Sequence, residues 1–241
     1  MTKEKVESLQ IPMMVQKNTS PLGTAFTVSI EAKHGVTTGI SAHDRSKTIL
    51  TAVDPHSTHL DITMPGHIFP LMARDGGVLV RTGQTEGSVD IARLAGLIPA
   101  AVICEILKDD GTMARRPDLE IFSQEFNIPI ITIADLVSYR LRHESFIRRL
   151  AETSLEVADF GQFRLIVYEN TLNNREQIVF VKGEVHSEQT IPVRVHREQY
   201  PEDIFSINLS KKGKDLHSAF RYLSKSPCGV IVYMTQNDQR P

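Results

Sequence analysis

The chain has 241 residues, of which 41% are apolar, and its 27 Lys and Arg nearly balance 29 Asp and Glu. Because domains most often contain about 100–150 residues, this length predicts two modest domains. The balanced charge supplies no overall positive field, so we expect no nucleic acid and no anionic membrane surface as a partner. Small molecules are the expected partners.

The two cysteines and the apolar runs indicate the cellular compartment of the protein. Cys104 and Cys228 lack the even spacing of a secreted disulfide framework. The first ten residues are charged and lack the apolar centre of a signal peptide. The longest apolar run, residues 97–107, is interrupted by Pro99 and Glu105 and is shorter than the roughly 20 residues that cross a bilayer. We therefore expect a cytoplasmic protein.

The first expected elements are a strand and a helix. Residues 25–32 alternate between apolar and polar side chains with period two, which predicts a strand. Ser41 can cap the helix that follows, with Asp44 in its first turn near the positive end of the dipole. Pro55 ends this helix.

Two short extended segments and a second helix come next. Residues 67–73 and 78–81 are expected to be extended. Thr85 or Ser88 then caps a helix that stops at Gly96. The residues just before that cap should lie at a helix N-terminus.

The middle of the chain alternates strands with helices. Residues 100–106 form an apolar run that predicts a strand buried on both faces, with Glu105 near its end. A helix over residues 117–126, a second buried strand over 129–133 and a charged helix from about residue 135 toward 152 follow. This alternation indicates a layered α/β domain with a mixed sheet.

A smaller unit follows this domain. Its expected elements are strands at 163–168, 177–185 and 191–196, a helix at 216–224 and a strand at 229–234. The predicted fold class is therefore α/β (α+β), with one domain over residues 1–150 and a smaller αβ domain over 151–241.

Several blocks in the first domain carry a resemblance. Residues 35–41 read Gly-Val-Thr-Thr-Gly-Ile-Ser, residues 81–86 read Arg-Thr-Gly-Gln-Thr-Glu, and residues 109–115 read Asp-Asp-Gly-Thr-Met-Ala-Arg. In this order, over about residues 1–145, they closely resemble 3,4-dihydroxy-2-butanone 4-phosphate synthase. The resemblance implies conversion of ribulose 5-phosphate to the four-carbon phosphate and formate for riboflavin synthesis. It also implies Mg²⁺ and a homodimer, or pairing with another pathway subunit.

That reaction requires a divalent ion for vicinal substrate oxygens, groups that move protons, and cations or amides for the phosphate. By resemblance, Glu105 and His67 would be catalytic. The substrate would contact Thr38, Asp44, Arg45, Arg81, Thr82, Gly83, Gln84, Thr85 and Glu105. Structural roles are the alternative: Arg81 as an ordinary surface ion-pair residue, Thr85 as a helix cap, and His67 as a hydrogen-bonded histidine beside an aromatic side chain.

Two departures from the family pattern affect the expected catalysis: the residue at position 84 and the acidic loop. Gln84 stands where the family has a metal-ligating histidine, and its amide can reach a hard cation but cannot titrate. The family's acidic loop, which supplies a glutamate metal ligand, is expected to be missing from an N-terminally shortened synthase domain, because Met1 falls after the position of that loop. We therefore expect weak Mg²⁺ binding and impaired synthase turnover. The alternative is a non-catalytic paralogue that binds sugar phosphate or assists a complete synthase.

The second unit resembles the beginning of GTP cyclohydrolase II through residues 160–164, 181–184 and 193–196. That family holds zinc on three cysteine thiolates. The corresponding residues here are Gln199, Ser210 and Lys212, and neither His196 nor His217 is expected to be a ligand. We therefore expect no zinc, no cyclohydrolase activity, and a degenerate domain with a structural or regulatory role.

Overall fold

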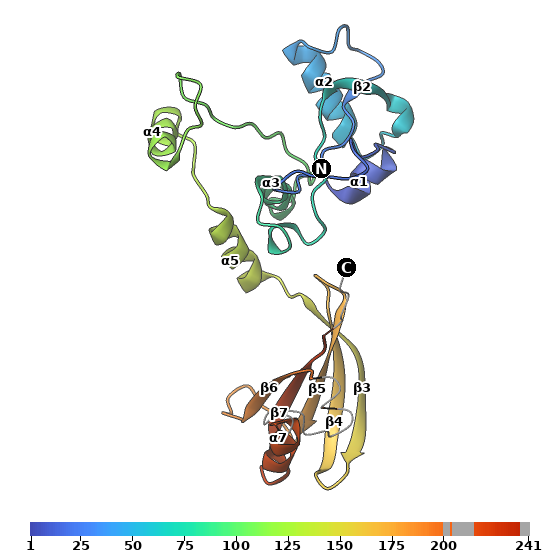
Figure 1. Ribbon diagram of the computed structural model, residues 1–241, viewed down its shortest axis with the longest axis vertical. Coiled ribbons are helices and arrows are strands. Elements are labelled where there is room, and N and C mark those ends of the chain that lie inside the picture. The colour runs from blue at the N-terminus through green and yellow to red at the C-terminus, as the bar shows by residue number, and fades with distance from the viewer. Residues whose placement is uncertain (200–202, 204–214, 237–241) are drawn as a thin grey trace. The chain divides into compact units, whose positions relative to one another are not determined.

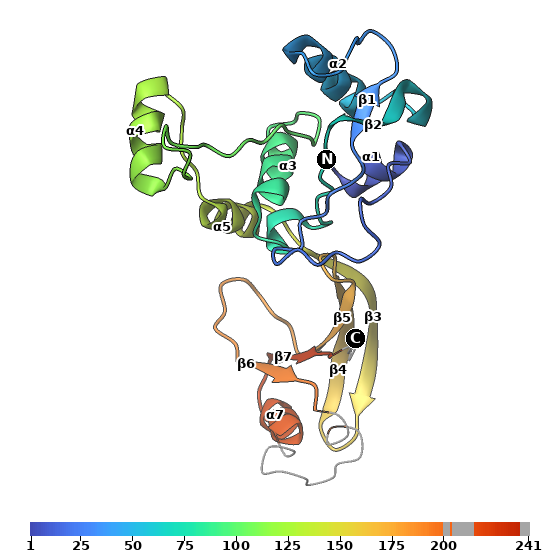
Figure 2. The same cartoon turned by 45° about the horizontal axis from the view of Figure 1, so that its top comes forward.

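The computed structural model describes residues 1–199, 203 and 215–236. The chain divides into two compact units, Met1–Glu144 and Ser145–Pro241 (Figure 1; Figure 2). Both units combine helices with strands, so the expected α/β class is confirmed. No helix in the described parts of the chain is long and apolar enough to cross a membrane.

The first unit is built around a small two-stranded antiparallel sheet of β1 and β2. Its elements are α1 (Lys3–Ser8), β1 (Ile30–Ala32), α2 (Ala42–Val53), η1 (His59–Asp61), β2 (Ile62–Ile68), η2 (Gly77–Leu79), α3 (Gln84–Leu94), α4 (Arg116–Phe126) and α5 (Ile133–His143). The core cluster contains Val6, Leu9, Ile11, Ile30, Ala52 and Ile62. Helices α1 and α2 thus pack with both strands.

The N-terminus of α2 agrees with the prediction from sequence. The Ser41 side chain accepts a hydrogen bond from the backbone N–H of Asp44, as an N-cap residue should. The helix ends at Val53, just before Pro55. The helix predicted over residues 117–126 is also present as α4.

The two buried strands predicted in this unit are wrong. Residues 100–106 form no strand, and the side chain of Val102 is 71% exposed. In the second segment Ile130 and Ile131 are exposed, and α5 begins at Ile133 after Thr132 caps it. No strand of the described chain pairs with either segment, so neither one gains a hydrogen-bonded ladder that would bury its apolar side chains.

Three boundaries also differ from the prediction. Residues 78–81 are not extended, because Gly76 and Gly77 adopt positive φ and lead into the turn η2. The N-cap of α3 is Gly83 rather than Thr85 or Ser88.

The long charged helix is the third difference, because α5 stops at His143 instead of running toward residue 152. Its end is fixed by ion pairs: Arg140 contacts Asp90 over 2.8 Å and Glu144 over 2.9 Å. Arg93 of α3 also reaches Glu144 over 2.9 Å. These charges hold α5 against α3.

The second unit is a five-stranded sheet with one described helix. Its elements are β3 (Ile147–Val157), β4 (Gly161–Asn170), β5 (Arg175–Lys182), β6 (Val193–Arg197), α7 (Asp215–Ser224) and β7 (Gly229–Met234). The strand order is β3-β4-β5-β7-β6, with only β6 and β7 parallel. Strand β3 was missed from the sequence, and the other four strands and α7 lie at the predicted places.

The core of this unit is aromatic. Phe220 and Leu223 of α7 pack against Phe160, Phe163 and Ile231. Helix α7 therefore covers one face of the sheet.

Candidate active site

The N-terminus of α3 is where Arg81, Thr82, Gly83, Gln84 and Thr85 meet. Gly83 is the N-cap, Thr82 and Gln84 are exposed, and Thr85 is buried. An added Cβ at Gly83 would lie 2.3 Å from Nη1 of Arg81, so only glycine allows the guanidinium to pass this close to the helix start.

The guanidinium of Arg81 is bound inside the protein. Its Nη1 lies 2.5 Å from Oε2 of Glu86, whose side chain is 1% exposed. Its Nη2 donates to the Leu22 carbonyl over 3.1 Å and to the Thr24 hydroxyl over 3.2 Å. The other oxygen of Glu86 accepts from the backbone N–H of Arg74. Arg81 thus neutralises a buried carboxylate, which differs from the surface ion pair considered from the sequence.

The side chains of Gln84 and Glu105, two of the site residues named from the resemblance, are in contact. The side-chain amide of Gln84 donates to Oε1 of Glu105 over 2.9 Å. Glu105 lies on an exposed extended segment rather than at the end of a buried strand. One carboxylate and one amide oxygen are the hard donors at this place.

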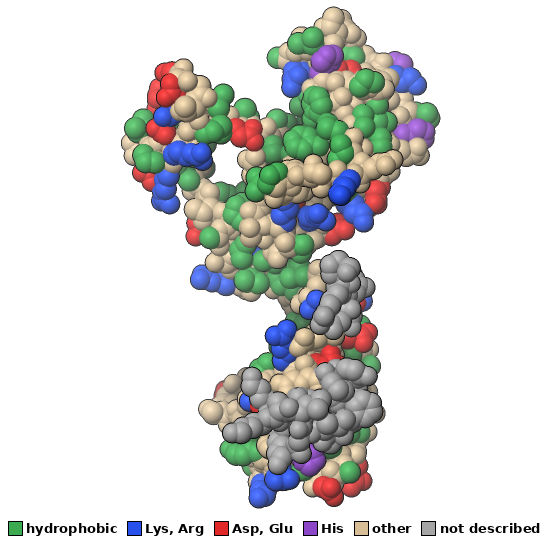
Figure 3. All heavy atoms as spheres, in the orientation of Figure 1, with side chains coloured by type: hydrophobic (Ala, Val, Ile, Leu, Met, Phe, Trp, Pro, Cys, Tyr) green, Lys and Arg blue, Asp and Glu red, His purple; other side chains and the backbone are tan. Residues whose placement is uncertain are grey.

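A trough with a volume of about 550 Å³ lies next to this pair. Its lining is mostly apolar and includes Phe26, Ile49, Phe69, Ile98 and Val102. Its polar lining residues are Arg45, Thr85, Ser88 and Glu105. Hydrophobic side chains also gather on the face of the first unit shown in Figure 3. Arg81, Thr38 and Asp44 are not among the residues that line the trough.

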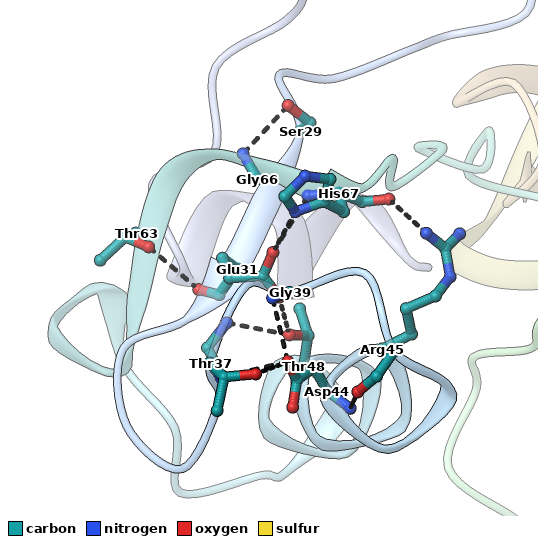
Figure 4. Close-up of polar contacts among 12 residues, drawn as sticks. Ser29, Glu31, Thr37, Gly39, Asp44, Arg45, Thr48, Thr63, Gly66 and His67 are labelled. Carbon is teal, nitrogen blue, oxygen red and sulfur yellow. Dashed lines mark hydrogen bonds and ion pairs between the residues drawn. The ribbon is translucent and has the colours of Figure 1, made fainter.

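His67 lies on β2 beside Glu31 of β1 (Figure 4). Its Nδ1 is 2.8 Å from Oε2 of Glu31, and its backbone N–H donates to the same oxygen over 3.2 Å. Nη1 of Arg45 donates to the His67 carbonyl over 3.3 Å. Arg45 thus lines the trough and contacts the His67 backbone, whereas His67 itself is not a lining residue.

Asp44 supports the loop that contains Thr38. Its Oδ2 accepts hydrogen bonds from the Thr37 hydroxyl, the Thr37 N–H and the Gly39 N–H over 2.9–3.1 Å. The Thr37 hydroxyl, together with these N–H groups, holds the pKa of Asp44 below its ordinary value although burial opposes ionisation. Thr38 itself is exposed. The geometry gives Asp44 a loop-anchoring contact.

Sequence reasoning missed Glu31 and Glu86. Each is an acidic residue in a segment that packs against the core, and each is paired with a predicted site residue. The available signal was the cost of burying an unpaired carboxylate, which requires a partner nearby.

Comparison with known proteins identifies the family of this chain. Residues 1–139 match the profile of 3,4-dihydroxy-2-butanone 4-phosphate synthase. The chain belongs to this synthase family. Residues 148–241 match GTP cyclohydrolase II, so the second unit of this synthase-family chain carries a cyclohydrolase-type domain.

Curated relatives agree with this assignment. The riboflavin biosynthesis protein RibBA of Aquifex aeolicus is 47% identical and aligns with 100% of this chain, which covers 59% of that relative. The 3,4-dihydroxy-2-butanone 4-phosphate synthase of Pseudomonas aeruginosa is 45% identical over 97% of this chain and 64% of its own length. The chain thus spans about three fifths of the length of these relatives.

Solved structures agree as well. RibBX, a two-domain 3,4-dihydroxy-2-butanone 4-phosphate synthase from A. baumannii, matches with a TM-score of 0.73 and 40% identity. It aligns with 100% of this chain, which covers 66% of RibBX. A synthase in complex with two magnesium ions matches 59% of this chain and 72% of its own, with a TM-score of 0.54 and 34% identity. Magnesium is therefore a ligand known in this family.

The donors found here do not fit a magnesium site by themselves. Mg²⁺ prefers an octahedral set of oxygens that includes carboxylates. Glu105 offers one carboxylate, and one of its oxygens already accepts from Gln84. Within residues 1–199, 203 and 215–236, no cluster of three His, Cys, Asp or Glu side chains is placed to hold a metal ion.

Of the three residues expected from the resemblance to stand in place of zinc cysteines, only Gln199 is described, and Ser210 and Lys212 lie outside the described residues. His196 is buried and contacts Asp203 over 3.0 Å. His217 packs edge-on against Phe160.

Proposed function

We propose that the first unit binds ribulose 5-phosphate in the trough beside Glu105, and that it catalyses the synthase reaction of riboflavin biosynthesis with impaired turnover. The observation that carries this proposal is the contact of Gln84 with Glu105. In it an amide, which cannot titrate, contacts the carboxylate at the position where the resemblance implies a metal-ligating histidine.

The polar lining of the trough suits a sugar phosphate. Arg45 supplies an exposed cation for the phosphate, and Thr85 adds a hydroxyl at the start of α3. Glu105 faces the same space and can accept hydrogen bonds from sugar hydroxyls. His67 is proposed as the proton-transfer group, because imidazole is the commonest general acid or base in enzymes. No step is assigned to a metal ion.

Formate release measures the first part of the proposal. The purified chain with Mg²⁺ and ribulose 5-phosphate should release formate at least ~100-fold more slowly than the relative from Pseudomonas aeruginosa, as expected for loss of one group needed in the transition state. A rate close to that of the relative would contradict the impairment.

Calorimetric titration measures the second part. Arg45→Ala should weaken ribulose 5-phosphate binding by about tenfold, since a charge-assisted hydrogen bond is lost, and Arg45→Lys should lose less. Equal affinity of wild type and Arg45→Ala would place the phosphate elsewhere.

A non-catalytic paralogue is the second candidate, favoured by the same Gln84 substitution. It would bind the sugar phosphate without forming formate, or pair with a complete synthase subunit. Size-exclusion chromatography with light scattering, alone and mixed with the Pseudomonas aeruginosa relative, separates a homodimer from a mixed assembly.

The second unit is proposed to lack zinc and GTP cyclohydrolase II activity. Gln199, Ser210 and Lys212 offer no thiolate, and a lysine ammonium repels a cation. Elemental analysis of the purified chain should find less than about one zinc per ten chains, and a chelator should leave the melting temperature unchanged. Stoichiometric zinc that a chelator removes, with a lower melting temperature, would refute this.

A further inference from the structure

The pairing of β1 with β2 places His67 over Glu31. Ile30 pairs with Ile68, whereas the next residue, Glu31, pairs with Thr63, so the intervening residues of β2 bulge out of the ladder. The bulge approaches β1 closely at Gly66, where an added Cβ would lie 2.1 Å from the Ile30 carbonyl. Only glycine allows this approach, which brings the neighbouring imidazole onto the Glu31 carboxylate.

The hydrogen bonds around Glu31 fix the direction of each proton. The hydroxyl of Thr48, which is fully buried, accepts from the backbone N–H of Ala32 over 3.0 Å. Its own proton is therefore directed to Oε1 of Glu31, 2.5 Å away. Oε2 accepts from the backbone N–H of His67. Glu31 is thus surrounded by donors, as an ionised carboxylate requires.

The charge of Glu31 is consistent with this geometry. Its side chain is 12% exposed. Burial opposes ionisation, but hydrogen bonds from Thr48 and His67 outweigh it and hold the pKa of Glu31 below its ordinary value. An ionised carboxylate only accepts hydrogen bonds, so the Nδ1 of His67 at 2.8 Å must carry a proton.

The other ring nitrogen of His67 is left available. Its Nε2 makes no hydrogen bond to any described residue, and the side chain is 44% exposed. We propose that Glu31 is a positioning residue for His67, which holds the neutral imidazole as the Nδ1–H tautomer and presents Nε2 as a free base. This inference rests on the proposed function in that His67 moves a proton there.

The loop over residues 37–41 packs against Glu31 and His67. An added Cβ at Gly39 would lie 2.0 Å from Oε2 of Glu31 and 2.5 Å from Nδ1 of His67. Asp44 of α2 holds this loop through the N–H of Gly39. Arg45, the other charged group nearby, contacts only the His67 carbonyl. Glu31 is therefore the charged side chain that meets the ring itself.

The test is NMR of the full chain labelled with ¹⁵N in the histidine rings, at about pH 8, where an ordinary histidine is neutral. Wild-type His67 should show a protonated Nδ1 and an unprotonated Nε2. Glu31→Gln keeps the shape, but its amide group can donate to Nδ1, so the tautomer ratio should shift toward Nε2–H by about tenfold or more. Glu7→Gln, an exposed carboxylate change on α1, is the matched control and should leave the ratio unchanged.

Two results would overturn the inference: a wild-type ring that is protonated on Nε2, or a Glu31→Gln ring with the wild-type ratio. Gly39→Ala is a second variant that tests the inference. Its added methyl group displaces the Glu31 carboxylate and should shift the tautomer ratio of His67 in the same direction. The wild-type spectrum decides the question even where a variant does not fold. Since the readout needs no substrate, the formate assay tests the proposed function separately and leaves this result intact.

Discussion

The side-chain amide of Gln84 donates a hydrogen bond to Oε1 of Glu105 over 2.9 Å, which joins the first turn of α3 to the segment that carries Glu105. The pair has one negative charge, and its amide N–H₂ faces the carboxylate. A cation at this point would meet the donor hydrogens of Gln84 unless the amide turned over. The hydrogen bond thus occupies one oxygen of Glu105.

Gln84→Glu should create a magnesium response. Two carboxylates at hydrogen-bond distance repel each other, so one pKa rises and a divalent cation relieves the repulsion. Mg²⁺ at tenfold its dissociation constant should stabilise the variant by about 1.4 kcal/mol and leave wild type nearly unchanged. Differential scanning calorimetry with and without Mg²⁺ measures this.

The double variant Gln84→Glu/Glu105→Gln has again one carboxylate and serves as the control. Its melting temperature should not respond to Mg²⁺. Equal responses of wild type, single and double variants would contradict a role of these two positions in cation binding.

Arg81→Ala should destabilise the first unit. It removes the partner of Glu86, a carboxylate that is 1% exposed, and leaves a buried charge. Breaking a buried pair costs about 3–5 kcal/mol, and less here because Glu86 keeps its bond from the Arg74 N–H. Urea unfolding should show a loss of about 2–4 kcal/mol.

A double variant tests whether the unpaired charge of Glu86 causes the loss of stability. In Arg81→Ala/Glu86→Gln no unpaired charge is buried, so part of the lost stability should return. If the double variant is as unstable as the sum of both single variants, the ion pair is not the cause.

Local signals explain which elements could be predicted from the sequence. Ser41 with Asp44 defines the start of α2, and the alternating or continuous apolar runs define the strands around Phe163 and Ile231. These signals act within a few residues, so they need no knowledge of the rest of the fold. The apolar content of residues 100–106 led to the wrong prediction of a buried strand. Such a strand also needs hydrogen-bonded neighbours, which the segment itself does not reveal.

The candidate site shows the same limit. The family resemblance placed Gln84 and Glu105 in one candidate site, and the structure joins them by a hydrogen bond. Glu31 and His67 are 36 residues apart and meet only through the bulge in β2. No spacing rule connects them, because the contact depends on the register of two strands.

Glu144→Gln should weaken the junction of α3 and α5 in a pH-dependent way. Hydrogen bonds and charge from Arg140, and to a smaller extent from Arg93, lower the pKa of Glu144 to about 2. A glutamate in the unfolded chain has a pKa of about 4.3, so the stabilisation is fully present above that pH and is lost as the pH falls toward 2. At neutral pH the variant should be about 1–2 kcal/mol less stable, as expected for a partly exposed charged hydrogen bond.

Urea unfolding between about pH 7 and pH 3 measures the difference between wild type and this variant. The difference should shrink steadily below about pH 4.5. Glu125→Gln, an exposed change on α4, should show no such trend. A gap that stays constant down to about pH 3 would mean that the charge of Glu144 is not what stabilises the junction.

Phe220→Ala should unfold the second unit selectively. The Phe220 ring stacks on Phe160 at 5.8 Å and meets Phe163 and Phe180 edge-on at 5.4 and 5.1 Å, so one side chain joins α7 to the sheet. Truncating a buried phenylalanine costs about 3–5 kcal/mol, a large share of the stability of a small unit. Hydrogen exchange should therefore show lost protection in β4, β5 and β7. Amides of α2 in the first unit should keep theirs, because the first-unit core cluster around Leu9 and Ile30 contains no residue of the second unit.

Tyr222→Ala provides the matched change on the same helix. Its side chain is 64% exposed, so the truncation removes little buried area and should alter stability by no more than about 0.5 kcal/mol. If both variants lose protection equally, helix propensity rather than aromatic packing holds α7 in place. If Phe220→Ala also releases α2, the two units unfold together and the aromatic cluster stabilises more than its own sheet.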